Sequence, residues 1–279
     1  MSDFRKIVWL ASYPKSGNTW ARMFLANYLV NGDQPFPINQ AHRFAMSDSA
    51  LQTYKMVAGR PVDPRNADDV LRLRDRVLQG VVANGADVNF VKTHNMPGRI
   101  KGHFMIPNKF TRSAIYVVRN PLDVVLSYAR HFGRNKERAV QSLARADNWI
   151  APTEHLVPQY LGRWDAHVKG WTKPADYPQL VLRYEDLLTD PAAEFTKLLE
   201  HVGIPVEPAR LQKAVEFSSF KVLAGQERSG GFDEKSTQAT AFFSKGQSGQ
   251  WKDDLAPELV EKIKAEHGKT MKKYGYLDE

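Results

Sequence analysis

Apolar residues in this chain follow two alternating patterns: short continuous runs, and longer segments with helical spacing. The short runs are rich in strand-forming residues and predict β-strands at 7–11, 88–93, 114–118 and 180–184. Apolar positions three and four residues apart predict helices at 19–30, 68–82, 121–132, 158–171, 191–202, 207–217 and 257–274. Strands that alternate with helices predict an α/β fold with a mainly parallel central sheet flanked by helices.

The first strand and the first helix are joined by a polar turn at residues 12–18. The free N–H groups and the positive dipole end of such a helix face the turn and favour an anion there. The candidate phosphate ligands are Lys15, Ser16, Gly17, Asn18 and Thr19. The lysine adds a charge, the glycine lets the backbone approach a ligand, and the others offer hydrogen bonds. The alternative is a buried turn with an exposed lysine, because the GxxxxGK[ST] order is absent.

Polar residues also follow the second and third predicted strands. Lys92 and His94 lie at the end of the second strand, Arg119 directly follows the third, and Ser127 lies in the next helix. In an open parallel sheet, residues after the strands face one crevice, so we expect these side chains near the polar turn. The alternatives are a structural histidine, an ion pair between Arg119 and Asp123, and a serine on the helix surface.

Two stretches have weaker patterns. Residues 31–87, apart from the helix at 68–82, are expected to cover the sheet. Residues 225–240 contain a Ser-Gly-Gly sequence and predict a mobile loop within the domain. No internal repeat or low-complexity tract separates the chain into further domains.

Composition limits the classes of partner. A length of 279 residues with 42% hydrophobic content is enough for a large core, and we expect one domain over residues 1–279. The net charge of +8 favours anionic partners, but the basic residues are scattered among acidic ones, which argues against nucleic acid. No cysteine and no N-terminal apolar segment suited to export or membrane insertion is present, so a cytoplasmic location is expected.

Five motifs resemble those of the soluble sulfotransferases and occur in the same order over nearly the whole chain. They are YPKSGNTW at 13–20, VKTH at 91–94, VVRNPLDVVLSY at 117–128, LRYEDL at 182–187 and SKGQSGQWK at 244–252. This family transfers a sulfuryl group from 3′-phosphoadenosine 5′-phosphosulfate (PAPS) to a hydroxyl or amine. The resemblance implies a fold related to P-loop nucleotide kinases, with PAPS as co-substrate and adenosine 3′,5′-bisphosphate (PAP) as product.

The resemblance also implies roles for single residues. Residues 15–19 would bind the 5′-phosphosulfate, Trp20 would lie against the adenine, and Arg119 and Ser127 would bind the 3′-phosphate. Ser244 replaces the arginine that the family usually has. The further implied nucleotide contacts are Tyr184, Ser218, Phe220, Ser244, Lys245 and Gly246.

The implied chemistry gives His94 the role of general base, while Lys15 and Lys92 stabilise charge on the transferring and leaving groups. No metal is expected, because cations and loop N–H groups can neutralise the leaving nucleotide. The alternatives are a nucleotide-dependent kinase on the same fold, which would need Mg²⁺ and a lysine-serine pair after a loop glycine, and a non-catalytic nucleotide-binding protein. A small-molecule acceptor is expected, but its identity is not encoded in a recognisable motif.

The dimer motif of the resembled family, KxxxTVxxxE, is only half present. Lys252 and Glu261 match it, but Ala256 and Pro257 replace the threonine and valine. Proline lacks the N–H that an extended pairing segment could use. The sequence therefore predicts a monomer, or a dimer that is not built on this motif.

Overall fold

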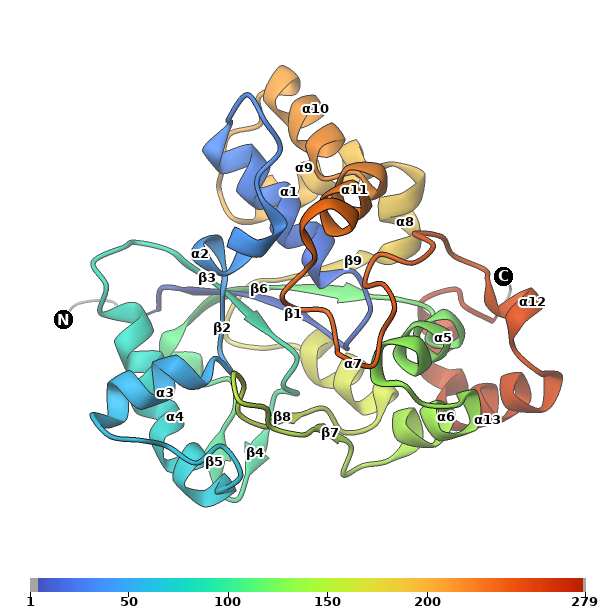
Figure 1. The fold of residues 1–279 in the computed structure, drawn as a ribbon, viewed down its shortest axis with the longest axis horizontal. Coiled ribbons are helices and arrows are strands. Elements are labelled where there is room, and N and C mark those ends of the chain that lie inside the picture. Colours follow the sequence, from blue (N-terminus) through green and yellow to red (C-terminus); the bar gives the residue numbers. More distant parts are fainter. Residues whose placement is uncertain (1–4, 278–279) are drawn as a thin grey trace.

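The computed structural model describes residues 5–277, and within them five strands form one parallel sheet (Figure 1). The strand order is β2-β3-β1-β6-β9. The bounds are Met46–Ser47 for β2, Asn89–Thr93 for β3, Ile7–Ser12 for β1, Thr111–Val118 for β6 and Gln179–Arg183 for β9. The expected α/β class with a parallel sheet is confirmed. Residues 1–4 and 278–279 of the expected domain lie outside the described residues.

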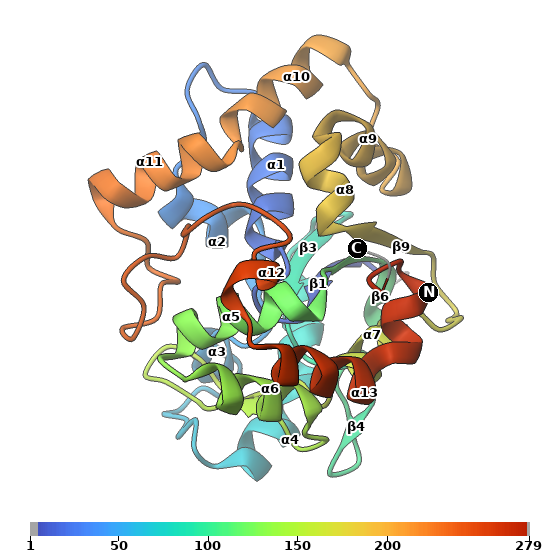
Figure 2. The same cartoon turned by 90° about the vertical axis from the view of Figure 1, so that its right-hand side faces the viewer.

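Helices cover both faces of the sheet (Figures 1 and 2). One face carries α1 (Asn18–Val30), α8 (Tyr184–Thr189), α9 (Pro191–His201) and α10 (Pro208–Phe217). The other carries α4 (Ala67–Val82), α5 (Pro121–Phe132), α6 (Lys136–Ala144), α7 (Trp164–Thr172) and α13 (Pro257–Lys273). Successive side chains of a strand point to opposite faces. Val8 and Leu10 of β1 therefore join the first core, and Ile7, Trp9 and Ala11 join the second.

Shorter elements complete the fold. Residues 31–87, weakly patterned in sequence, contribute β2, α2 and α3 in addition to α4. Two small antiparallel hairpins, β4 with β5 and β7 with β8, lie outside the main sheet. The bounds are Ala41–Phe44 for α2, Leu51–Ala58 for α3, Phe220–Gly230 for α11, Trp251–Asp254 for α12, Arg99–Ile100 for β4, His103–Phe104 for β5, Trp149–Ile150 for β7 and Gln159–Tyr160 for β8. Single 3₁₀ turns occupy Ile38–Gln40 and Asn108–Phe110.

The loop predicted at 225–240 is wrong for residues 225–230, which belong to α11. Leu223 and Ala224 of this helix are buried, and so is Glu227 one turn later. The carboxylate of Glu227 accepts hydrogen bonds from the backbone N–H groups of Phe242 and Phe243, at 2.7 and 2.9 Å. The cluster of glycines that suggested a loop marks the end of the helix, where Gly231 has φ 72.

Two element boundaries also differ from the sequence prediction. The helix expected from residue 158 begins only at Trp164, because Gln159–Tyr160 forms β8 and Gly162 has φ 63, which interrupts a helix. The strand expected to include Tyr184 ends at Arg183, and Tyr184 is the first residue of α8.

The position of β1 in the sheet explains where the site forms. β1 lies between β3 and β6, so the chain crosses β1 on its way from β3 to β6. Ligands of open parallel sheets bind beyond the carboxyl ends of the strands at such a switch in strand order. The residues after β1, β3 and β6 include Lys15, His94 and Arg119, which therefore meet at one edge of the sheet.

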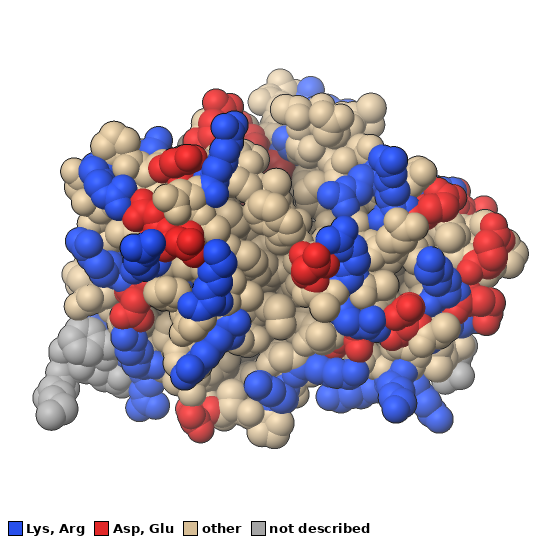
Figure 3. Space-filling view, turned by 90° about the horizontal axis from the view of Figure 1, so that it is seen from below, with Lys and Arg blue, Asp and Glu red and all other residues tan. Residues whose placement is uncertain are grey.

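The face of the molecule seen from below shows no strong separation of charge. On the face drawn in Figure 3, Lys and Arg side chains are interspersed with Asp and Glu side chains. Among residues 5–277, no helix is long and apolar enough to cross a bilayer.

Candidate active site

The turn after β1 is fixed by contacts with β1 itself and with Tyr184 of α8. The side-chain amide of Asn18 donates a hydrogen bond to the carbonyl of Leu10 at 2.8 Å. Gly17 has φ 109, and a Cβ there would lie 2.8 Å from Cδ2 of Tyr184. The Oγ of Ser16 is buried and has no hydrogen-bond partner in the described part of the chain. The alternative of a turn with an exposed lysine is wrong, because Lys15 is partly buried beneath Phe242, with Nζ 3.4 Å from the ring centroid.

Arg119 connects this turn to the segment before α12. Its guanidinium donates to the carbonyl of Lys15 at 3.1 Å and to that of Gln247 at 2.9 Å, and it lies 4.1 Å from the centroid of the Tyr184 ring. The Nε atom is buried without a partner among the described residues. Arg119 does not pair with Asp123, whose carboxylate instead accepts the backbone N–H groups of residues 249 and 251. The cation is therefore held at the strand end with one donor unpaired.

The cations around the turn repel one another. Burial, then Arg119 and Lys92, lower the pKa of Lys15 to about 7. An anion bound at the turn would remove this penalty, because an opposite charge favours the protonated lysine. The local electrostatics therefore favour a negatively charged ligand.

His94, directly after β3, is held as a neutral imidazole. Its Nδ1 lies 2.8 Å from the carbonyl oxygen of Ser12, so Nδ1 carries the proton and donates it to that bond. Burial, followed by the charge of Lys92, lowers the pKa of His94 well below its ordinary value. Nε2 has no hydrogen-bond partner between residues 5 and 277 and retains its lone pair.

A second histidine holds the backbone of the first. His167 of α7 donates from Nε2 to the carbonyl of His94 at 3.1 Å, and its Nδ1 lies 2.9 Å from the hydroxyl of Tyr116. The Nδ1 atom is then an acceptor, and Tyr116 is the donor. Burial lowers the pKa of His167 to about 4, which keeps this arrangement neutral. Sequence reasoning did not single out His167, because it follows no strand and lies inside a helix.

Three further charged or titratable residues that sequence reasoning missed belong to the same cluster. Arg22 of α1 and Glu234 form an ion pair at 2.8 Å, and Glu234 also pairs with Lys92 at 2.7 Å. His131 of α5 packs edge-on against Phe242, and burial and Lys15 lower its pKa to about 3. Of the three, only Arg22 could have been noticed in the sequence, because it is the single charged residue in the apolar segment 19–30.

The residues expected on the adenine side form an aromatic group. The ring of Trp20 meets those of Tyr184 and Phe195 edge-on, at 5.9 and 5.8 Å between centroids. Phe220 begins α11 and is partly exposed, and a Cβ on Gly246 would collide with its ring. Ser218, in contrast, is fully buried and donates its hydroxyl to the carbonyl of residue 214 at 2.7 Å.

The remaining expected nucleotide contacts are exposed or unpaired. Lys245 forms an exposed ion pair with Asp254 at 2.8 Å, and Ser244 is exposed. The hydroxyl of Ser127 on α5 has no hydrogen-bond partner within residues 5–277. Arg130, three residues later, lies close enough to Arg119 that this neighbour, after burial, lowers its pKa. Arg130 is thus a further cation beside Arg119.

No group of three His, Asp or Glu side chains suited to a metal ion occurs within residues 5–277. Glu185, the acidic residue after β9, accepts hydrogen bonds from the backbone N–H of Asn120 and from the hydroxyl of Tyr276, both at 3.0 Å. These contacts tie α8 to α5 and to the C-terminal residues, which is a structural role.

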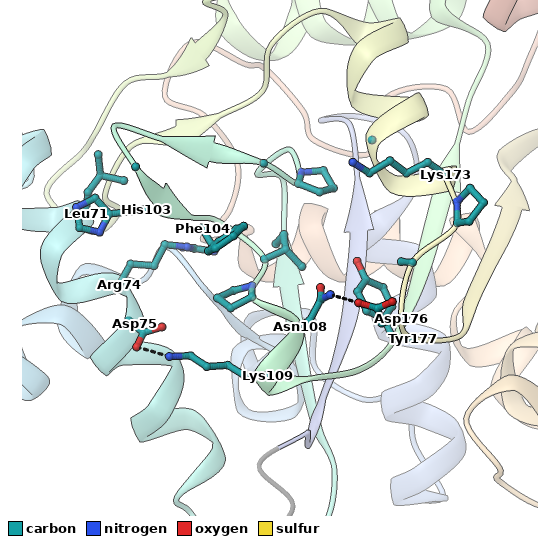
Figure 4. A pocket seen from close by; sticks show the side chains of 18 residues that line it. Leu71, Arg74, Asp75, His103, Phe104, Asn108, Lys109, Lys173, Asp176 and Tyr177 are labelled. Atoms are coloured by element: carbon teal, nitrogen blue, oxygen red, sulfur yellow. Dashed lines mark hydrogen bonds and ion pairs between the residues drawn. The ribbon is translucent and has the colours of Figure 1, made fainter.

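A cavity of about 720 Å³ lies at the opposite edge of the sheet, beside the residues that precede β6 and β9 (Figure 4). Lys109 pairs there with Asp75, and Asn108 donates to Asp176 (Figure 4). Lys109 and Asp75 thus neutralise each other, whereas the cations around the turn after β1 repel one another.

A family model described as "Sulfotransferase domain" matches residues 5–275 of the chain. The chain is a member of the sulfotransferase family. Two relatives match this sulfotransferase over most of its length. Flavonol 3-sulfotransferase of Flaveria bidentis is 26% identical over 281 residues, covering 92% of this chain and 78% of the relative. Sulfotransferase 1 family member D1 of Mus musculus is 27% identical over 278 residues, covering 94% and 82%.

The fold of this sulfotransferase is also found in a solved structure, that of retinol dehydratase in complex with androsterone and the inactive cofactor PAP. The two chains are 18% identical, the TM-score is 0.68, and the match covers 95% of this chain and 80% of the other. The five-stranded sheet and its flanking helices are therefore the family fold.

Proposed function

We propose that this sulfotransferase transfers a sulfuryl group from PAPS to a hydroxyl or amine of a small-molecule acceptor, with His94 as general base. The observation that carries the proposal is a neutral histidine with a free Nε2 among the cations Lys15 and Lys92. Residues 1–279 would form one sulfotransferase domain. A cytoplasmic location and independence of metal ions remain predictions.

The turn after β1 fits the phosphosulfate end of the nucleotide. The unpaired hydroxyl of Ser16 and the N–H groups that open α1 offer hydrogen bonds to a phosphate. Glycine at position 17 permits this turn, because a Cβ there would collide with the ring of Tyr184. Lys15 contributes a cation whose lowered pKa rises when an anion binds. The PAP complex of retinol dehydratase supports the choice of nucleotide.

The 3′-phosphate would be held by residues after β6. Arg119 has an unpaired Nε, and Ser127 has a free hydroxyl on the helix that follows. Arg130 adds charge in the same region. The edge of Trp20 and the face of Phe220 would border the adenine, while the buried hydroxyl of Ser218 is committed to its own helix and contributes packing instead.

PAPS supplies an activated sulfuryl group, and the protein's residues supply the proton acceptor and the opposing charge. The acceptor hydroxyl or amine would donate a hydrogen bond to Nε2 of His94, which takes up its proton as the acceptor attacks. The Nδ1–H bond to Ser12 keeps the ring oriented and stabilises the imidazolium that forms. Lys15 and Lys92 would stabilise negative charge on the transferring group and on the leaving phosphate.

A transfer assay tests this function. The protein is incubated with ³⁵S-labelled PAPS and panels of phenols, alcohols, amines and glycans, and labelled products are separated from the nucleotide. Transfer to at least one acceptor is expected, together with competition by PAP but not by ATP. Tight binding of ATP with no labelled product from any panel would contradict the proposal and favour a kinase.

A further inference from the structure

The carboxylate of Glu234 lies between two cations from separate parts of the fold. Arg22 of α1 donates two parallel hydrogen bonds to it, Nη1 to Oε1 at 2.9 Å and Nη2 to Oε2 at 2.8 Å. Nζ of Lys92, at the end of β3, donates to Oε2 at 2.7 Å. The Arg22 side chain is 1% exposed and that of Lys92 is 15% exposed. The side chain of Glu234 is 28% exposed, so the three residues form one partly buried ion network beside His94.

This network restricts the position of Lys92. A lysine ammonium is a compact charge on a flexible stem, whereas an arginine guanidinium is planar and fixes a carboxylate through two bonds. Arg22 therefore orients Glu234, and Glu234 in turn orients the ammonium. We propose that Glu234, held by Arg22, is a positioning residue that keeps Lys92 protonated and directed at the site of sulfuryl transfer. The inference rests on the role proposed above for Lys92.

Side chains other than Glu234 hold the backbone of its own segment. The segment between α11 and α12 leaves α11, passes beside α5 and continues to α12 (Figure 1). Glu227 binds the N–H groups of Phe242 and Phe243, and Asp123 binds those of Gly249 and Trp251. Nearer to Glu234, Asn39 accepts the backbone N–H of Asp233 at 2.9 Å. Because other side chains hold the backbone beside and after Glu234, the ion pair with Lys92 serves the lysine more than the segment.

The charges around Lys92 explain why it needs a carboxylate. Burial lowers its pKa, Glu234 raises it, Arg22 lowers it, and Asp48 raises it. The charge of Lys92 in turn lowers the pKa values of Lys15, His131 and His94. Without Glu234, the groups that face the ammonium are mainly cations and neutral imidazoles. Lys92 would then release its proton at a lower pH, and a neutral amine cannot oppose the charge of the transferring group.

The test compares Glu234→Gln with Asp233→Asn. Asp233 is the preceding residue and is exposed, so its variant removes the same charge without touching the network. For Glu234→Gln we expect kcat to fall about tenfold or more, the usual effect of losing a hydrogen bond to a charged group. The basic limb of the kcat profile should move to lower pH by about one unit, while the Kd for PAP stays within about threefold. Asp233→Asn should match wild type.

A second measurement reads Lys92 without turnover. The titration of its ¹⁵Nζ is followed by NMR in the PAP complex, with the signal assigned by its loss in Lys92→Met. A Lys92 pKa that falls in Glu234→Gln, and falls less in Glu234→Asp, supports the inference. An unchanged pKa in both variants overturns it. An unchanged pKa would not contradict sulfuryl transfer itself, because the titration requires no acceptor. The acceptor screen tests that function separately.

Discussion

Binding of PAP should weaken as pH rises above 7, and Lys15 is the reason. In the free protein, burial beside Arg119 and Lys92 lowers the pKa of Lys15 to about 7. A phosphate bound at the turn raises this pKa again, because it replaces repulsion with attraction. Binding therefore takes up a proton, is favoured below pH 7 and becomes weaker as the free lysine loses its charge.

The magnitude follows from the titration of a single group. With a pKa of about 7, roughly a tenth of the free lysine is protonated at pH 8 and roughly a hundredth at pH 9. If the charged form binds, Kd rises about tenfold per pH unit, or about 1.4 kcal/mol. The phosphates themselves contribute little, because their second pKa of about 6 is already passed.

Calorimetric titration of PAP at pH 6.5 to 9, in two buffers of different ionisation enthalpy, measures both Kd and proton uptake. The matched control is Lys15→Arg, since arginine keeps its charge over this range. Its Kd should vary less with pH than that of wild type. A wild-type Kd that is flat from pH 7 to 9, with no proton uptake, would refute the assignment of a phosphate to Lys15.

Three further predictions concern the nucleotide site and assembly. Ser244→Arg should tighten PAP binding about tenfold or more in calorimetry, by adding a charge-assisted contact; if nothing is gained, Arg130 already fills that place and Arg130→Ala should show the loss instead. Gly17→Ala should abolish PAP binding, because the φ of 109 at this residue and the nearby Tyr184 ring both oppose a Cβ. The control Gly59→Ala, at φ 65 with open space around it, should lower the free energy of unfolding by about 1 kcal/mol and leave the Kd for PAP unchanged. Crosslinking should not join two copies of residues 252–261, since Pro257 starts α13 there and Glu261 pairs with Lys264; a crosslink between equivalent residues of this segment would show that prediction to be wrong.

Much of the sheet could be predicted because its strands are short apolar runs bounded by turns. Residues 7–11, 88–93 and 114–118 correspond to β1, β3 and the greater part of β6, and the polar residues after them meet at one edge. Parallel strands align their carboxyl ends, so the neighbourhood of Lys15, His94 and Arg119 followed from order along the chain alone.

What the sequence did not show depends on contacts between distant residues. Glu234 lies 142 residues from Lys92 and 212 from Arg22, and no local pattern connects them. Helix α11 was missed because its glycines outweighed a weak apolar spacing, and its stability depends on burial of Leu223 and on the Glu227 contacts with Phe242 and Phe243. The tautomer of His94 likewise depends on the carbonyl of Ser12, which ends the neighbouring strand β1.

The measurement that tests the central claim most directly is single-turnover sulfuryl transfer by His94→Ala, with an acceptor from the screen and saturating labelled PAPS. The rate should fall by about two orders of magnitude or more, which is the usual effect of a positioned base. The Kd for PAP should change little, because the phosphate contacts lie on the turn after β1 and on the residues after β6. A variant that transfers the sulfuryl group at a near-normal rate would contradict the assignment of His94 as the base.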